Sequence, residues 1–163
     1  ATSADDLLGH PGFRATENAW RTMQTLADVA AASGCRLVLQ TLDGENPGVR
    51  RLMADPEAFL KDELAARDAA GFPPKADLVA VTAVAPTEAE ARGKIERLAA
   101  SLRSVAGTTI SVSGPLRPSN PFRHGTWRSL LVIRSKALTK PVLAALRALP
   151  EDFIIDRDPE YLG

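Results

Sequence analysis

The sequence predicts an α+β protein in which one four-stranded sheet carries two helices on one face. Over residues 78–156, segments of strand and helix pattern follow one another in the order strand, helix, strand, strand, helix, strand. A capping box at Thr87 and a glycine at position 107 mark the two ends of the first of these helices. This order is that of the ferredoxin-like split βαβ arrangement, βαββαβ.

The N-terminal part begins with a helical pattern over residues 16–32, and Ser33-Gly34 closes this segment. Residues 37–42 then predict one short strand. A lone strand cannot satisfy its backbone groups, and no neighbouring segment could pair with this one. We therefore expect its partners upstream of the first residue, so that the opening ATSADDLLGHPGF is a cut end.

A second helix is predicted over residues 55–70. Asp55 suits the N-cap, and Pro56 suits the first helical position, where its missing N–H is harmless. The residues expected to pack are Phe59, Leu60 and Leu64. The two prolines of Phe72-Pro73-Pro74 stiffen the connection that follows, which predicts a domain boundary there.

The C-terminal part opens with a strand over residues 78–84 that is apolar on both faces, as is typical of a central strand. The helix that begins at Thr87 has one apolar stripe, formed by Ile95, Leu98, Leu102 and Val105. The remaining predicted elements are strands at 109–113, 127–133 and 153–156 and a helix at 142–149. Residues 114–125 form a long loop with three prolines, and such loops in compact domains are usually functional or disordered.

Composition and charge limit the classes of function. The chain has 163 residues, and no apolar run approaches the roughly 20 residues of a membrane span. The formal net charge is zero, but residues 1–72 carry 7 basic and 11 acidic groups, whereas residues 115–163 carry 8 and 5. Residues 115–149 contain seven Lys and Arg and no Asp or Glu, which predicts an anionic ligand.

The sequence offers little to an enzyme, which would need a nucleophile with a base, or a metal cluster. The single Cys35 allows no internal disulfide and no thiolate metal site, which fits a reducing compartment. His10 and His124 lie far apart in the chain. We therefore expect no catalytic residue here.

Four segments carry motifs that occur together, in this order, in one family. They are residues 5–26, residues 37–53 (LVLQTLDGENPGVRRLM), residues 55–74 (DPEAFLKDELAARDAAGFPP), and the C-terminal set SGPLRP, GTWRSLLVIRSK and IIDRDPEYLG. In the third segment the matching positions are Phe59, Glu63, Leu64, Arg67, Pro73 and Pro74. These motifs resemble the C-terminal part of the replication-restart helicase PriA family, also called primosomal protein N-prime.

The resemblance implies three parts of the chain. Residues 1–54 are the end of a second RecA-like helicase lobe, residues 55–74 are a linker helix with the Pro-Pro connection, and residues 75–163 are a ferredoxin-like domain that binds DNA and partners. The family binds ATP and zinc through segments upstream of this part. No phosphate-binding G-x-x-x-x-G-K-[ST] occurs in this chain, so the resemblance implies no cofactor here.

One departure from the family is informative. The family's last helicase motif, Q-V-A-G-R-A-G-R, aligns with residues 27–34, a stretch with alanine and serine and without arginine. In such motors the arginines stabilise the charge that develops on the transferred phosphate. The departure implies a parent protein that has lost ATP-driven unwinding and persists as a DNA-binding scaffold in replication restart.

The predicted DNA-binding site combines the proline-rich loop with the strand that follows it. Guanidinium groups suit phosphates, and an aromatic ring can support a base. The residues are Arg117, Arg123, His124, Trp127, Arg128 and Arg134. The alternative is a solvated loop in which Trp127 is a core residue. The expected ligand is branched or single-stranded DNA.

A partner-binding site follows from the resemblance at Lys136 and Lys140, which match positions of a pocket that receives the acidic C-terminal tail of the single-stranded-DNA-binding protein. Other primosome proteins are further expected partners. Pro141 is restricted to the first helical turn, which predicts that the following helix starts late. The alternative is that both lysines are ordinary surface residues.

The acidic residues near the C-terminus, Asp156, Asp158 and Glu160, could suggest a metal, but no His or Cys joins them and Pro159 breaks the strand. We expect a structural chain end and no metal. As an alternative function, the C-terminal domain could dock onto helicase lobes or onto the single-stranded-DNA-binding protein without touching DNA. The family and the lack of a membrane segment imply a cytoplasmic protein of the bacterial nucleoid.

Overall fold

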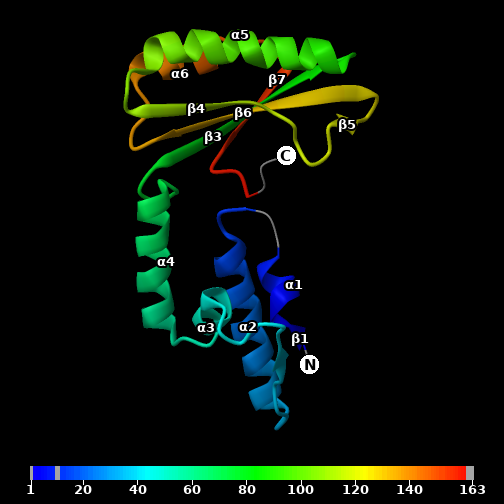
Figure 1. Cartoon of the computed structure of the whole chain (residues 1–163), viewed down its shortest axis with the longest axis vertical. Coiled ribbons are helices and arrows are strands. Elements are labelled where there is room, and N and C mark those ends of the chain that lie inside the picture. The colour runs from blue at the N-terminus through cyan, green and yellow to red at the C-terminus, as the bar shows by residue number, and fades with distance from the viewer. Residues whose placement is uncertain (1, 10–11, 161–163) are drawn as a thin grey trace. The chain divides into compact units, whose positions relative to one another are not determined.

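A computed structural model describes residues 2–9 and 12–160. The chain divides into two compact units, residues 1–66 and 67–163, and the division falls in the last turn of helix α4 (Pro56–Ala70). Figure 1 shows helices in the first unit and a sheet with its helices in the second. This mixture of helices and antiparallel sheet confirms the predicted α+β class.

The first unit is built from short elements around one long helix. In chain order they are β1 (Thr2–Ser3), α1 (Ala4–Leu8), α2 (Ala15–Ala32), β2 (Leu39–Gln40) and α3 (Pro47–Leu52), followed by most of α4. Side chains from α1, α2 and α3 form its core, which comprises Ala4, Ala19, Met23, Val49 and Leu52.

The expectation that the strand at residues 37–42 has no partner in the chain is wrong. β2 pairs in parallel with β1, with Thr2 opposite Leu39. Asp5 holds the chain beyond the strand, because its carboxylate accepts hydrogen bonds from the Thr41 hydroxyl at 3.2 Å and from the Leu42 N–H at 2.9 Å. Each strand has only two residues, too few for a sequence pattern to reveal the pair.

Two helices of the first unit were not predicted, because five or six residues are too few for helical periodicity. Both begin with a capping side chain. The Ser3 hydroxyl accepts from the Asp6 N–H at 3.2 Å ahead of α1, and the Asn46 side chain accepts from the Gly48 N–H at 2.8 Å ahead of α3.

Helix α4 starts as predicted, since the Asp55 carboxylate accepts from the N–H groups of Glu57 and Ala58 at 3.0 and 2.9 Å. Phe59 is fully buried and stacks on Trp20, with ring centroids 4.6 Å apart. The expectation that Leu60 and Leu64 pack is wrong. They are 52% and 44% exposed, because the buried face of α4 runs through Phe59 and Glu63, four residues apart.

The second unit has the predicted order of elements with one addition. It contains β3 (Asp77–Ala85), α5 (Glu88–Ala106), β4 (Ile110–Leu116), β5 (Phe122–Arg123), β6 (Thr126–Ser135), α6 (Lys140–Arg147) and β7 (Phe153–Arg157). The strand order is β4-β6-β3-β7 with antiparallel neighbours, and β5 pairs only with β6. The predicted βαββαβ arrangement is therefore confirmed.

Helices α5 and α6 lie together on one side of this sheet (Figure 1). The core between the layers includes Val81, Leu131, Ile95, Leu102 and Val142. The expected place of Val105 in the buried stripe of α5 is wrong, because Val105 is 43% exposed and Ala106, one turn beyond Leu102, is buried instead.

The predicted loop at residues 114–125 is partly sheet. β4 continues to Leu116 after a shift in register beyond Ser113, and β5 forms a hairpin with the start of β6. His124 and Gly125 make the turn, with φ of 52° and 76°. Positive φ at both positions is typical of tight hairpin turns, but His-Gly is a weaker sequence signal for such a turn than Asn-Gly.

Within the part of the chain that the structure describes, no helix has the length and apolar character needed to cross a membrane.

Candidate nucleic-acid interface

The β5–β6 hairpin presents Arg123 and His124 at its tip. Both residues are exposed, and the Arg123 Nε–H donates to Nε2 of His124 at 3.1 Å. The turn is fixed by its own backbone and side chains, since the Thr126 hydroxyl donates to the Arg123 carbonyl at 2.9 Å. The tip therefore presents two nitrogen-rich side chains on a short, defined turn.

Trp127 lies at the base of this hairpin. It is half-buried, and its ring packs against Phe122 on the paired strand, with centroids 5.2 Å apart and planes inclined by 54°. Phe122 itself is 50% exposed. Trp127 is therefore neither a fully buried core residue nor a freely exposed ring. Its ring packs against Phe122 and borders an exposed aromatic surface. Sequence reasoning missed Phe122. The signal that could have revealed it is its place opposite Trp127 across a short turn at His124-Gly125.

Arg117 and Arg128 line one pocket of about 290 Å³ at the start of α5. Residues that sequence reasoning missed complete it: Glu88, Arg92, Pro115, Leu116 and Ser129. Arg128 is half-buried, and its Nε is buried without a hydrogen-bond partner among the described residues. The fold thus assembles three guanidinium groups and one carboxylate from segments that are distant in the sequence.

Arg92 is the guanidinium of this pocket with a visible partner. Its Nε donates to the Glu96 carboxylate at 2.8 Å, one helical turn away on α5. The pKa of Arg92 is raised, mainly by this hydrogen bond and by the charge of Glu96, with a weaker contribution from Glu88. Arg92 therefore stays positively charged. Both partners are largely exposed, so water and salt screen the pair.

Arg134 does not join this group. It lies six residues beyond Arg128 on β6, about 20 Å away along an extended strand. There it pairs in register with Leu78, and its guanidinium lies 5.9 Å from the ring centroid of Phe72. The six predicted DNA-binding residues therefore divide between the hairpin and pocket at one end of β6 and Arg134 toward the other.

Lys136 and Lys140 flank the connection between β6 and α6, and both side chains are exposed. The connection is held by Ser135, whose hydroxyl donates to the Ala137 carbonyl at 2.7 Å and accepts from the Ala137 N–H at 3.2 Å. α6 begins at Lys140, two residues earlier than predicted, and Pro141 occupies its first turn. The proline is compatible with this early start because the first turn needs no N–H at that position.

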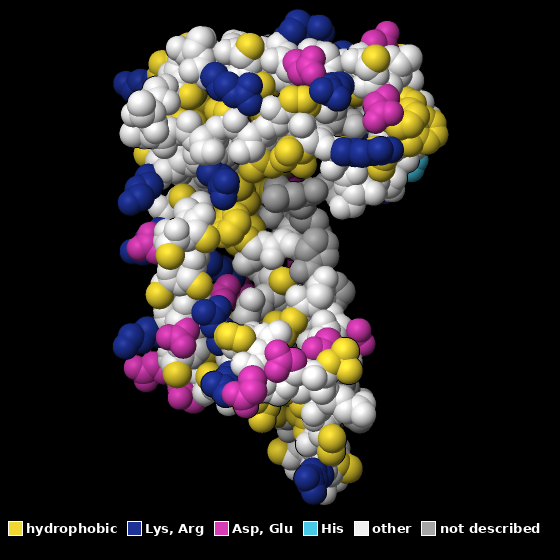
Figure 2. All heavy atoms as spheres, in the orientation of Figure 1, with side chains coloured by type: hydrophobic (Ala, Val, Ile, Leu, Met, Phe, Trp, Pro, Cys, Tyr) yellow, Lys and Arg dark blue, Asp and Glu magenta, His cyan; other side chains and the backbone are white. Residues whose placement is uncertain are grey.

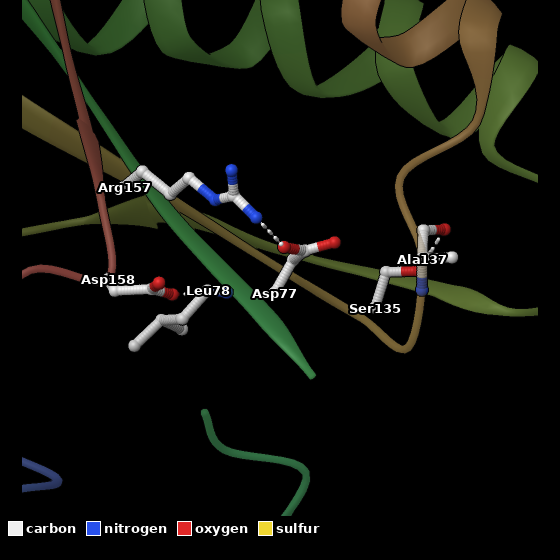
Figure 3. A network of polar contacts seen from close by, with 6 residues as sticks. All are labelled: Asp77, Leu78, Ser135, Ala137, Arg157 and Asp158. Carbon is white, nitrogen blue, oxygen red and sulfur yellow. Dashed lines mark hydrogen bonds and ion pairs between the residues drawn. The ribbon is translucent and has the colours of Figure 1, made fainter. Parts of the chain in front are cut away.

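Of the acidic residues near the C-terminus, Asp156 pairs with Ala80 in the sheet, and Asp158 contacts the start of β3 (Figure 3). The Asp158 carboxylate accepts from the Leu78 N–H at 3.3 Å, and the Asp158 N–H donates to the Leu78 carbonyl at 2.7 Å. Next to it, Arg157 of β7 donates to Asp77 of β3 at 2.6 Å. No group of three or more potential metal ligands occurs among the residues that the structure covers.

A second ion pair ties α5 to the segment before β7. Lys94 donates to the Asp152 carboxylate at 2.5 Å and to the Val84 carbonyl at 2.8 Å. The hydrogen bond from Lys94 lowers the pKa of Asp152; burial acts in the opposite direction, and the positive charge of Lys94 adds to the lowering. This contact fixes α5, and with it one wall of the pocket, relative to the sheet.

Figure 2 shows Lys and Arg side chains spread over the visible face of the second unit, with fewer Asp and Glu among them. The sequence of this unit, residues 67–163, contains 14 Lys and Arg and 10 Asp and Glu. An exposed surface of this kind attracts polyanions and loses that attraction as salt increases.

Comparison with known proteins finds relatives that share one description. The chain is 28% identical over 137 residues to a probable replication restart protein PriA of Deinococcus radiodurans, a match that covers 83% of the chain and 15% of the relative. It is 23% identical over 170 aligned positions to the replication restart protein PriA of Synechocystis, covering 99% of the chain and 20% of the relative. A probable PriA of Mycobacterium leprae is 33% identical over 118 residues, covering 64% and 18%.

The chain therefore spans about a fifth or less of the length of the curated relatives that it matches. No family model matches the sequence. The three relatives nevertheless confirm the resemblance predicted from the motifs.

Proposed function

We propose that this chain, a relative of a short part of the PriA replication restart proteins, is a DNA-binding region that acts in replication restart at forks. The observation that carries the proposal is the acid-free stretch at residues 115–149, of which Arg117, Arg123 and Arg128 lie near one end of β6. Arg117 and Arg128 line a pocket there, and Arg123 is exposed on the adjacent hairpin.

Two kinds of contact support DNA as the ligand. Phosphate groups suit the guanidinium groups of the pocket and the hairpin, since such contacts supply most of the sequence-independent affinity. The exposed ring of Phe122 beside Trp127 suits an unpaired base, and stacking on aromatic rings is worth about 1–3 kcal/mol per base. Together they favour DNA with a single-stranded or branched part.

The proposal assigns no catalytic step to this chain and no helicase activity to its parent, because residues 27–34 lack the arginines of the family's last helicase motif. We assign ATP and zinc binding to other segments of the parent. Lys136 and Lys140 are the proposed contacts for the acidic tail of the single-stranded-DNA-binding protein, and other primosome proteins are further proposed partners. The site of action is the bacterial nucleoid in the cytoplasm.

A direct test measures binding of the whole chain to single-stranded, duplex and forked DNA at two salt concentrations. The proposal expects binding to forked and single-stranded DNA at low salt and a steep loss at the higher salt. If the chain binds none of these three DNA forms at low salt, the proposal is wrong.

A second candidate function is a protein-docking module that does not touch DNA. It is favoured by the edge strand β7, where Ile154 and Ile155 are 48% and 45% exposed. Exposed apolar residues on a sheet edge suit a protein partner better than a phosphate backbone. If the DNA-binding test fails, this is the function that remains.

A further inference from the structure

We infer that the pocket at the start of α5 holds one phosphodiester group of the DNA strand, gripped by Arg117 and Arg128 with Arg92 beside them. This inference rests on the proposed function and deepens it, because it assigns one phosphate to a specific set of side chains. The pocket combines a loop residue, a strand residue and a helix residue, and sequence reasoning named only the first two.

The charges in the pocket favour an anion. Three guanidinium groups face one carboxylate, Glu88, which leaves a net charge of +2. Neither Arg117 nor Arg128 has an ion-pair partner among the described residues, whereas Arg92 already donates to Glu96. Glu88 repels an anion at the α5 side, so Arg117 and Arg128 supply the main contacts.

Arg128 gives an independent reason to expect a ligand. Its Nε is buried and has no hydrogen-bond partner within the described part of the chain. Buried donors in proteins are nearly always paired, and an unpaired one costs about 1–3 kcal/mol. The guanidinium is a planar fork suited to two oxygens of one phosphate, which lysine cannot match.

The pocket has the size and walls for such a group. Its volume is about 290 Å³, and a water molecule occupies about 30 Å³ of liquid, so a phosphate and its hydration waters fit. Pro115 and Leu116 provide an apolar wall that suits the sugar attached to the phosphate. The buried Ser129 adds a hydroxyl to the lining.

DNA offers two kinds of phosphate to this pocket. A phosphodiester within a strand carries one negative charge, whereas a terminal phosphate carries nearly two at neutral pH. The net positive pocket attracts both, so charge does not choose between them. The pocket is assigned to an internal phosphate because Pro115 and Leu116 offer an apolar wall to the sugars on either side of such a group, and a free 5′-phosphate should add little affinity.

The test uses the whole chain and the substitutions Arg117→Gln and Arg128→Lys. Arg128→Lys keeps the charge at a half-buried position, which limits any loss of folding, and removes the fork. Arg147→Gln is the matched control, because Arg147 is an exposed arginine of the same acid-free stretch outside this pocket. Binding to a single-stranded oligonucleotide is measured over a range of salt, with and without a 5′-phosphate.

Arg117→Gln and Arg128→Lys should each weaken binding about five- to tenfold at low salt. Arg117→Gln should also reduce the slope of log affinity against log salt by about 0.7. Arg147→Gln should change both quantities less. Equal effects of all three substitutions would overturn the pocket and leave the proposed function standing. A marked preference for the 5′-phosphorylated oligonucleotide would overturn the assignment to an internal phosphate.

A second measurement separates this inference from the proposed function. The Nε–H resonance of Arg128 is followed by nuclear magnetic resonance while inorganic phosphate replaces chloride at constant ionic strength. The inference expects a shift that is reduced in Arg117→Gln and retained in Arg147→Gln. If the chain binds no DNA but this shift occurs, the proposed function fails and the phosphate pocket stands. If the resonance does not move, the pocket is wrong whatever the chain binds.

Discussion

At the scale of single residues, Gly114 determines how the chain enters the pocket. Its φ is 147°, and a Cβ at this position would lie 2.9 Å from Leu131 Cδ1 and 3.0 Å from the Leu130 carbonyl oxygen. Only glycine combines that backbone conformation with such a close approach to β6. Because Pro115, Leu116 and Arg117 follow directly, this glycine positions one wall of the pocket.

Gly114→Ala should therefore lower the free energy of unfolding of the second unit by about 1–3 kcal/mol. The control is Gly93→Ala on α5, where the added Cβ meets only the end of the Arg97 side chain at 3.4 Å. Removing a helical glycine should stabilise by about 0.5–1 kcal/mol. Urea unfolding, followed by the amide protection of β6, measures both, and a Gly114→Ala chain as stable as the wild type would contradict this account.

The pair of Lys94 and Asp152 predicts a dependence of stability on pH. Because the hydrogen bond from Lys94 lowers the pKa of Asp152 in the folded chain, this carboxylate stabilises the fold above its unfolded pKa. That contribution is lost as the pH falls from about 4 through the lowered value.

The substitution Asp152→Asn should remove this part of the acid dependence. Thermal unfolding between neutral and acidic pH measures it, with the exposed Asp156→Asn as the matched control. The Asp152→Asn chain should lose less stability on acidification than the control. Identical pH profiles for the two variants would show that the ion pair does not contribute.

At the scale of elements, the packing of α5 against the sheet stabilises the second unit. The buried stripe of α5 ends with Leu102 and Ala106, which are 0% and 4% exposed, while Val105 projects away from it. Leu102→Ala should cost about 2–5 kcal/mol, because it leaves a cavity in the core. Val105→Ala should cost less than about 1 kcal/mol. Chemical denaturation of both variants measures this difference, and equal losses would contradict the assigned face of α5.

The elements that the sequence predicted well have strong periodicity or clear boundaries. The strand at β3 is apolar on both faces, and α5 has a capping threonine and a closing glycine. The elements it missed are short, or depend on partners far away. β2 is defined by β1, whose paired residues lie 37 positions earlier in the chain, and β5 exists only because β6 folds back beside it. The sequence pattern also gave the wrong buried residues for α4, because Leu60 and Leu64 are exposed in the structure.

The sequence predicted which kinds of residue form the candidate site, but it did not predict which segments of the chain come together there. The acid-free stretch pointed to Arg117, Arg123 and Arg128, which the fold brings to one end of β6. Glu88 and Arg92 could not be predicted, because they reach the pocket only through the packing of α5 beside β4. Arg134 belongs to the same stretch, yet the length of β6 separates it from the others.

At the scale of the whole molecule, charge is divided along with the structure. The first unit, residues 1–66, carries 6 basic and 10 acidic residues, and the second unit, residues 67–163, carries 14 and 10. The zero net charge of the chain thus conceals a negative and a positive unit. A net positive unit attracts polyanions over a distance that salt controls, which is the physical basis of the proposed DNA binding.

The most direct test of DNA binding is the affinity of the chain for forked DNA as a function of salt, for the wild type and for the combined substitution of Arg117, Arg123 and Arg128 by Glu. Reversal of three exposed charges in the first unit, at Arg36, Arg50 and Lys61, is the matched control. The account predicts that the first variant loses at least about tenfold in affinity at low salt and about 2–3 in the slope of log affinity against log salt, while the control loses less. Affinity and slope equal to those of the wild type would contradict the account and leave the docking module as the function of this chain.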